Sequence, residues 1–229
     1  MPLIKGNQSD NTAIANSASP PYTLTYGSHT VNTGSDRLLI VMFAHTTSIN
    51  ISGVAKWNGV NMTQLGATYD MPTANVRYSF FYLANPDTGN LNLTMDFTGL
   101  TTMAVSCWSL QNASTVSIQH QGNANTPHNN TVSVSANSMI LGVSTSAYSF
   151  DTNAITIDGT SFSYAGCEVS GSVSSGQLCA QLRDALLASG NRTVTTDTVA
   201  DSFQASNTVI YISSAAGVVA STQGMLMMF

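Results

Sequence analysis

The segment RLLIVMFAH, residues 37–45, is an almost uninterrupted apolar run of the length of a strand. A strand alternates its side chains between two faces, so both faces of this one are apolar. Runs of this kind are typical of a strand that is covered on both sides within a layered β structure. The segment therefore predicts the central, buried strand of an all-β fold.

The composition of the whole chain also favours strands. The 229 residues include 30 Ser, 28 Thr and 20 Asn, but one Glu and two Lys. Thr favours strands, and Ser and Asn favour turns and exposed strand faces, whereas long helices use Glu, Lys, Leu and Ala. The apolar fraction of 43% is ordinary and the net charge of −5 is small. The chain therefore differs from a disordered protein.

Charge and hydropathy argue against two classes of partner. The six basic residues are scattered singly and form no patch for nucleic acid. No run of 18 apolar residues is present, so we expect no transmembrane helix and no membrane partner. The first residues lack the apolar core of a secretory signal, which favours a cytoplasmic start or a virion protein.

Strand-like segments follow one another along most of the chain. Residues 1–21 are polar and end in Pro20-Pro21, so they are predicted to form an N-terminal arm outside a body at 22–229. Short segments rich in β-branched and aromatic residues, bounded by Gly, Asn, Asp or Pro, are predicted as strands. In the first half these are 22–31, 37–45, 53–57, 60–65, 75–84, 90–97 and 102–110. In the second half they are 131–135, 138–147, 154–158, 161–169, 177–183, 191–198 and 208–213.

The two halves of the chain resemble each other at an offset of 100 or 101 residues. SDRLLIVM (35–42) aligns with ANSMILGV (136–143), and Trp57-Asn58-Gly59 aligns with Ile157-Asp158-Gly159. Chance similarity between two Thr/Ser-rich stretches is the alternative, but a tandem duplication is the better interpretation. The predicted pseudo-repeats span about 22–120 and 121–229.

The predicted strands must pack in sheets, since each has a face that needs cover. They predict an antiparallel β-sandwich with jelly-roll or Greek-key connections. One fused body is favoured over two small sandwiches, because units of about 90 residues bury only marginal cores. The polar stretch SIQHQGNANTPHNNT (117–131) is predicted to be a domain linker or a long loop.

The stretch AKWNGVNMTQLG (55–66) predicts a tight β-hairpin. Asn-Gly between alternating apolar residues favours a type I′ turn, which needs positive φ at both central positions. Such a turn places Trp57 opposite Val60 and Ala55 opposite Met62, on one apolar face. Trp57 is therefore predicted to be a buried anchor, and an exposed platform for a sugar ring is the alternative.

The three cysteines, Cys107, Cys167 and Cys179, show no CxxC spacing, so a zinc site is not expected. Cys167 and Cys179 lie symmetrically about Val173, and a hairpin centred there would place them opposite each other. Two buried thiols on neighbouring strands are favoured over a disulfide.

The search for catalytic residues finds little. Glycosidases built on β-sandwiches use two carboxylates, but Glu168 is the single glutamate and the aspartates, Asp96 among them, show no close pairing. The four histidines, which are His29, His45, His120 and His128, lack the spacing of metal ligands. His45 is predicted to be a half-buried core residue. The sequence therefore predicts no catalytic residue, no metal site, no cofactor and no enzyme.

Four segments together resemble a β-sandwich module of phage virion proteins and bacterial extracellular proteins. They are RLLIVMFAH, VAKWNGVNMTQLG, VRYSFFYLANPDTGNLNLTMDF and MAVSCWSLQNAS. The module has similar motifs in this order, and the resemblance is clearest over residues 30–115. Where the group often has Trp in its last strand, this chain has Val209-Ile210-Tyr211. These motifs mark a jelly-roll-like fold, so the resemblance implies no catalytic residue.

The resemblance and the nearly uncharged Ser/Thr/Asn surface favour a virion structural protein. It would be a capsid decoration (cement) protein or a head or tail fibre subunit, assembled in the host cytoplasm. Its partners would be the major capsid protein or another virion protein, and copies of itself, trimers included, packed through apolar ends such as Met225–Phe229. The alternative is a carbohydrate-binding module or adhesin that stacks surface glycans on Tyr22, Tyr69 or Tyr148. A hydrolase using Glu168 and Asp96 is the least favoured.

Overall fold

The computed structural model describes residues 1–14, 20, 22–46, 48–71, 76–99, 102–124, 128–146, 155–161, 169–173, 176–182, 186–196 and 205–215. Over these ranges the chain forms antiparallel strands and no helix, which confirms the all-β prediction. Accordingly, the described residues contain no helix that is long and apolar enough to cross a bilayer.

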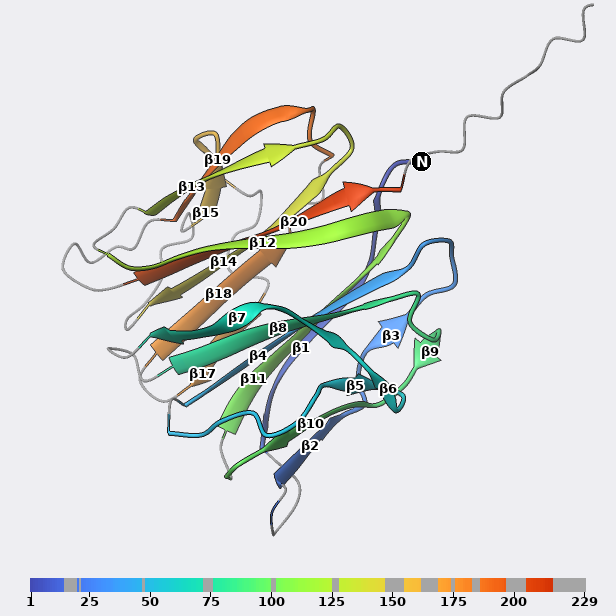
Figure 1. Cartoon of the computed structure of the whole chain (residues 1–229), viewed down its shortest axis with the longest axis vertical. Coiled ribbons are helices and arrows are strands. Elements are labelled where there is room, and N and C mark those ends of the chain that lie inside the picture. Colours follow the sequence, from blue (N-terminus) through green and yellow to red (C-terminus); the bar gives the residue numbers. More distant parts are fainter. Residues whose placement is uncertain are drawn as a thin grey trace, which may run out of the picture.

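The first part of the chain forms one large and one small sheet (Figure 1). The first large sheet has the order β1 (Ile4–Ile14), β11 (Thr102–Gln111), β4 (Leu38–Thr46), β8 (Val76–Ala84), β7 (Thr63–Met71). The first small sheet has the order β2 (Tyr22–Tyr26), β10 (Leu93–Phe97), β5 (Lys56–Trp57), β6 (Val60–Asn61). A two-stranded ribbon joins β3 (Thr30–Val31) to β9 (Gly89–Asn90).

The later part of the chain forms a second pair of sheets. The second large sheet has the order β12 (Ala113–Ala124), β20 (Ala205–Ser214), β14 (Met139–Ser146), β18 (Gly176–Leu182), β17 (Val169–Val173). The second small sheet has the order β13 (His128–Val134), β19 (Gly190–Thr196), β15 (Ile155–Ile157), β16 (Thr160–Ser161). We call the first pair of sheets the first unit and the second pair the second unit.

The four sheets stack as four layers (Figure 1). The two large sheets form the middle layers, and the two small sheets form the outer layers. Apolar side chains fill all three spaces between layers. The first core lies between the sheets of the first unit and includes Leu24, Trp57 and Phe97. The second core lies between the sheets of the second unit and includes Ile157 and Val194. The shared core lies between the two large sheets.

Strand β4 shows why the central segment is apolar throughout. Leu39, Val41 and Phe43 point into the first core, and the alternate residues, Ile40 and Met42 among them, point into the shared core. All five side chains are fully buried. The prediction of a strand covered on both faces is confirmed.

The two large sheets pack with their strand orders running in opposite directions. Edge strand β12 of the second unit lies against edge strand β7 of the first, and β17 lies against β11 and β1. The corresponding strands of the two units therefore lie at opposite ends of the shared core. This is the arrangement of an isologous contact, in which one surface packs against a second version of itself.

The strand orders of the two units correspond one to one. Residues that the sequence alignment equates also share backbone conformations. Asn58 and Asp158 have φ of 48° and 49°, and Asp36 and Asn137 have φ of 45° and 62°. The backbone N–H of Asn58 donates to Asn92 O and that of Asp158 to Thr193 O, each at 2.8 Å. The correspondence favours the predicted tandem duplication, which itself remains a prediction, as do the jelly-roll connections.

Two polar segments are strands rather than the predicted arm and linker. Residues 4–14 form edge strand β1 on β11, so the segment 1–21 is not wholly an arm outside the body. Most of 117–131 lies in β12 and β13. On β12, Val116 and Ile118 pack against the shared core while Ser117 and Gln119 are exposed. Because β12 belongs to the sheet of the second unit, that unit begins near residue 113 rather than 121.

The shared core predicts that the two units unfold together. Both tryptophans lie in the first unit, Trp57 in the first core and Trp108 in the shared core, so their fluorescence reports on that unit and on its contact with the second. Ile140→Ala empties a fully buried position in the second core. We expect this change to lower the free energy of unfolding by about 2–4 kcal/mol, measured by tryptophan fluorescence in urea as well as by circular dichroism.

Ser133→Ala, at an exposed position of β13, is the control and should leave the midpoint unchanged. A fluorescence midpoint that Ile140→Ala leaves in place, while circular dichroism shows an earlier phase, would contradict a single cooperative body.

The two hairpin turns predict a matched pair of backbone effects. Gly59 and Gly159 have φ of 82° and 76°, and an added Cβ would meet no atom within 4 Å at either position. Gly59→Ala and Gly159→Ala should each destabilise the protein by about 1 kcal/mol through backbone strain alone. Urea midpoints measure the effect, with exposed Asn61→Ala as the control. Equal stability of the glycine and alanine forms would rule out the left-handed turn.

Candidate functional site

Trp57 on β5 is a structural residue. Its side chain is fully buried, its indole Nε1 donates to Asp87 O at 3.0 Å, and its ring meets His29 edge to face at 6.0 Å. The pairing of Trp57 with Val60 is as predicted, although Val60 is 47% exposed. The prediction of a buried anchor is confirmed, and a sugar platform at Trp57 is excluded.

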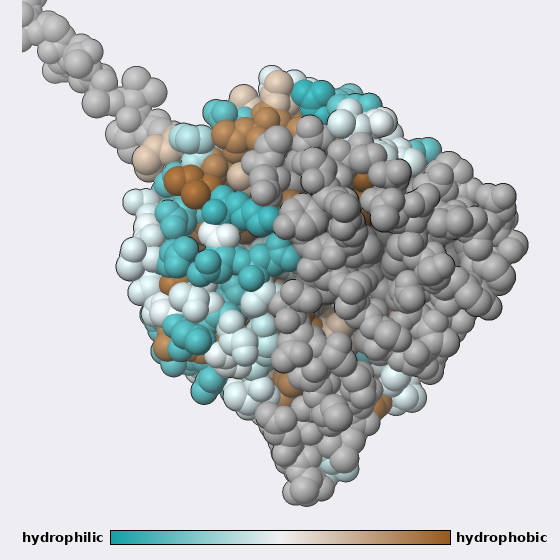
Figure 2. Space-filling view, turned by 180° about the vertical axis from the view of Figure 1, so that it is seen from behind, coloured by the Kyte–Doolittle hydropathy of each residue, from teal (hydrophilic) through white to brown (hydrophobic). Residues whose placement is uncertain are grey.

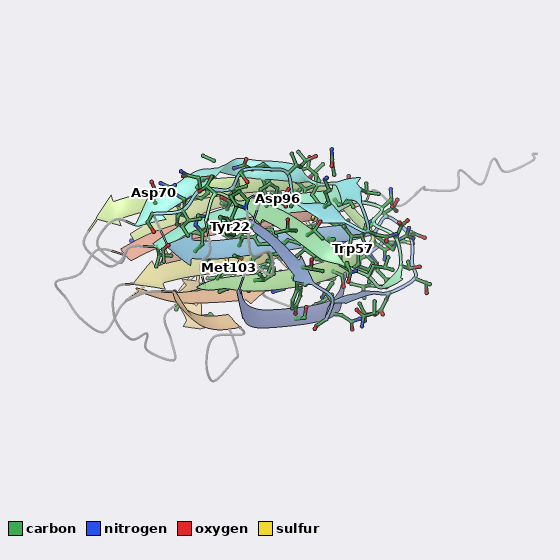
Figure 3. All side chains as sticks on the ribbon, turned by 90° about the horizontal axis from the view of Figure 1, so that it is seen from below. Tyr22, Trp57, Asp70, Asp96 and Met103 are labelled. Atoms are coloured by element: carbon green, nitrogen blue, oxygen red, sulfur yellow. The ribbon has the colours of Figure 1, made fainter. Side chains whose placement is uncertain are left out.

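The tyrosines proposed as stacking platforms are engaged with the protein. Tyr22, at the start of β2, packs against the first core (Figure 3). Tyr69 on β7 packs against the shared core and stacks on the ring of His120, with centroids 3.9 Å apart. Tyr148 lies outside the described residues. The aromatic residues singled out in the sequence therefore give no ready platform in the described part of the chain.

His29 lies in a buried polar chain that links β1 to β11. His29 Nδ1 is 2.8 Å from Ser9 Oγ, and Ser9 also hydrogen-bonds to the thiol of Cys107. Burial lowers the pKa of His29 to about 4, and burial raises the pKa of Cys107. A serine nucleophile needs a base that accepts a proton near neutral pH. With its lowered pKa, His29 is a weaker base than that chemistry uses.

His45, at the end of β4, is fully buried rather than half-buried as predicted. Its Nδ1 lies 2.9 Å from Thr46 O, and its ring meets Phe97 at 5.4 Å. Burial lowers the pKa of His45, although the hydrogen bond with the Thr46 backbone opposes this shift. The side chain is buried because its position on β4 points into the stack, where Phe97 covers it.

Arg77 and Asp70 form a surface clamp between β8 and β7. Arg77 Nε donates to Asp70 Oδ1, Arg77 Nη2 donates to Asp70 Oδ2 at 2.8 Å, and Arg77 Nη1 donates to Asn50 Oδ1. These hydrogen bonds lower the pKa of Asp70 and raise the pKa of Arg77. The side chain of Asp70 is 45% exposed, so the pair adds little stability and mainly fixes the edge strand.

A polar group inside the shared core joins the two units. Tyr78 Oη of β8 lies 3.0 Å from Thr208 Oγ1 of β20, and Thr208 Oγ1 lies 2.8 Å from His120 Nδ1 of β12. Tyr78 and Thr208 are fully buried. His120 lies in the polar stretch 117–131 that was predicted to be a linker or loop, so this contact was not predicted from the sequence. The alternation of Val116, Ile118 and His120 with polar residues is the signal that could have found it.

The remaining singled-out residues do not converge in the described part of the chain. Asp96 Oδ1 accepts a hydrogen bond from Thr23 Oγ1 at 2.6 Å on the first small sheet, and Glu168 lies outside the described residues. His128 begins β13. Over the described ranges no three His, Cys, Asp or Glu residues gather as metal ligands would.

The hairpin near the cysteines has another register than the one considered from the sequence. Strands β17 and β18 pair Val173 with Gly176, so Ser170 rather than Cys167 lies opposite Cys179. In this register Val173 is a paired strand residue rather than the centre of the hairpin. Cys167 lies outside the described residues.

A groove lies between the two units at one end of the shared core. Its volume is about 440 Å³. The first unit contributes the start of β4 and the end of β8, and the second unit contributes the start of β12. The residues that line it include Asp36, Arg37, Tyr82, Asn85, Ser114 and Thr115. Hydroxyl, amide, carboxylate and aromatic groups from both units therefore meet in one concave site.

The buried histidines predict a loss of stability between pH 6.5 and 4. The pKa of His29 is about 4 in the fold and near its ordinary value of 6.5 in the unfolded chain. Above pH 6.5 both states are neutral at this residue; below it the unfolded chain binds the proton first. Stability should therefore fall as pH falls, by up to about 3 kcal/mol from His29.

The test is how the free energy of unfolding, measured in urea, changes with pH. His29→Gln should flatten the slope between pH 6.5 and 4, while exposed Lys56→Gln should leave it as in the wild type. The lowered pKa of Asp70 adds a slope of the same sign below about pH 5, and this contribution cancels because it is present in both the wild type and His29→Gln. An unchanged slope in His29→Gln would show that His29 titrates normally.

Comparison with known protein families and with curated proteins gives no match to this chain.

Proposed function

We propose that this protein is a non-enzymatic structural protein of a virion, either a capsid decoration (cement) protein or a fibre subunit. It attaches to the major capsid protein or to another virion protein. The observation that carries the proposal is the four-layer β body, in which three packed cores make one solid unit from a short chain. Such a body suits a rigid structural part of a particle. The motifs that resemble phage virion modules supply strands β4, β5, β6, β8, β9, β10 and β11 and the start of β7.

The surfaces that remain for a partner are polar and carry few charges. Both faces of each large sheet are covered, which leaves the outer faces of the small sheets, the sheet edges and the loops. On the second small sheet, Thr131 lies opposite Thr193, and Thr195 donates to Asn129 Oδ1 at 2.6 Å. Figure 2 shows hydrophilic and intermediate residues over much of the described part of one molecular face, with hydrophobic residues gathered toward one end. Attachment through such surfaces depends on shape and neutral hydrogen bonds.

Self-association fits the same role. Subunits of particles commonly repeat around symmetry axes, and homo-oligomers such as trimers would multiply weak contacts with a shell. The shared core has already taken up the large apolar sheet faces inside one chain. Contacts between copies would therefore use the small sheets or segments outside the described residues, such as Met225–Phe229.

Glycan binding is the second candidate function. Tyr22 and Tyr69 do not offer stacking platforms for a sugar, because both rings pack against the protein. The half-buried Tyr82 in the groove between the units is the observation that now favours it.

Location on a particle tests the proposal. Particles purified from lysates of cells that carry the gene should bind antibody against this protein on their surface, seen by immunogold electron microscopy. Particles from a gene deletion, with and without added purified protein, provide the control. Because few charges are involved, retention on particles should change less than about threefold when salt is raised about tenfold. Protein found only in the soluble fraction, with unlabelled particles, would refute the virion role.

A further inference from the structure

We propose that the groove between the two units binds a neutral saccharide of one or two rings. This inference goes beyond the structural role and does not depend on a place in a virion. The groove volume of about 440 Å³ falls in the usual range of small-molecule sites, about 300–1,000 Å³.

The two walls of the groove come from different units and offer apolar surface. Tyr82 of β8 forms part of the first wall, and its half-buried ring packs against the shared core. Ala113 and Val116 of β12 form part of the opposite wall and also pack against that core. An aromatic ring fixed from behind, with its remaining surface in a groove, suits the apolar face of a pyranose ring.

Polar groups around the groove offer both hydrogen-bond donors and acceptors. Asp36 brings a carboxylate, Asn85 an amide and Ser114 a hydroxyl, and all three residues are exposed. The guanidinium of Arg37 donates to Gly34 O at 2.6 Å and to Pro86 O at 3.0 Å. Asp36 and Arg37 are the charged residues that line the groove, and their opposite charges leave the lining with no net charge. A neutral ligand rich in hydroxyl groups fits this set better than an ion does.

Backbone hydrogen bonds hold the rim of the groove in place before any ligand arrives. Asn85 N donates to Arg37 O at 2.7 Å, Ala113 N donates to Asp36 O at 2.9 Å, and Ala215 N donates to Asn112 O at 2.7 Å. Asp36, Asn85 and Asn112 all have left-handed backbone, with φ of 45°, 51° and 57°. A rim fixed in this way loses little conformational freedom on binding, which favours affinity.

Nuclear magnetic resonance of the full chain tests the proposal directly. The probes are maltose, cellobiose, lactose and N,N′-diacetylchitobiose, each titrated into isotopically labelled protein. At least one of them should shift amide signals that cluster at Asp36, Asn85 and Ser114. Ser114→Trp places a large side chain in the groove from an exposed position and should weaken binding by about tenfold or more. Ser133→Trp, on the outer face of the second small sheet, should bind as the wild type does.

Three results would overturn the proposal. They are the absence of shifts with all four sugars, shifts that lie away from the groove, and full binding by Ser114→Trp. A protein that binds sugar but is absent from particles would refute the virion role and leave this site intact. Immunogold-labelled particles together with no sugar binding would refute this site and support the virion role.

Discussion

The packing of the two large sheets against each other is the contact on which the whole structure depends. Each large sheet has two apolar faces, and its small sheet covers only one of them. If the units were separated, Ile40 and Met42 of β4 would face water, as would Leu141 and Ile210 of the second unit. Apolar surface of that extent causes association or aggregation in soluble proteins. The fold therefore needs both units in one chain, or a second copy in place of the missing one.

The polar group within this contact gives it a defined register. Apolar side chains alone tolerate sliding, because any apolar surface satisfies another. The hydroxyl groups of Tyr78 and Thr208 are buried, and they bond to each other only when β8 lies against β20. A shifted arrangement would break this buried hydrogen bond, at a penalty of about 1–3 kcal/mol. The stack is thus held by apolar burial and aligned by hydrogen bonds.

Most of the strands could be predicted from the sequence because their signals are local. The apolar run of β4 and the Asn58-Gly59 turn give strand and hairpin directly, and burial of Trp57 follows from the hairpin. Two of the missed strands, β1 and β12, occupy the same edge position in their units. Edge strands have one open side and tolerate polar residues, so their patterns resemble those of loops. The groove could not be predicted, since Arg37, Asn85 and Ser114 meet only after both units are packed.

The two hairpin turns differ in their susceptibility to deamidation. Asparagine followed by glycine is prone to loss of its side-chain amide, which turns Asn58 into an aspartate. The Asn58 amide now donates to Asp87 Oδ2 at 3.1 Å, so a carboxylate in its place would face a second carboxylate. The equivalent Asp158 is already an acid, and Arg192 Nη1 donates to it at 3.1 Å. Loss of the amide would therefore give both turns the sequence Asp-Gly, but the new carboxylate would lie beside Asp87 where Asp158 has Arg192.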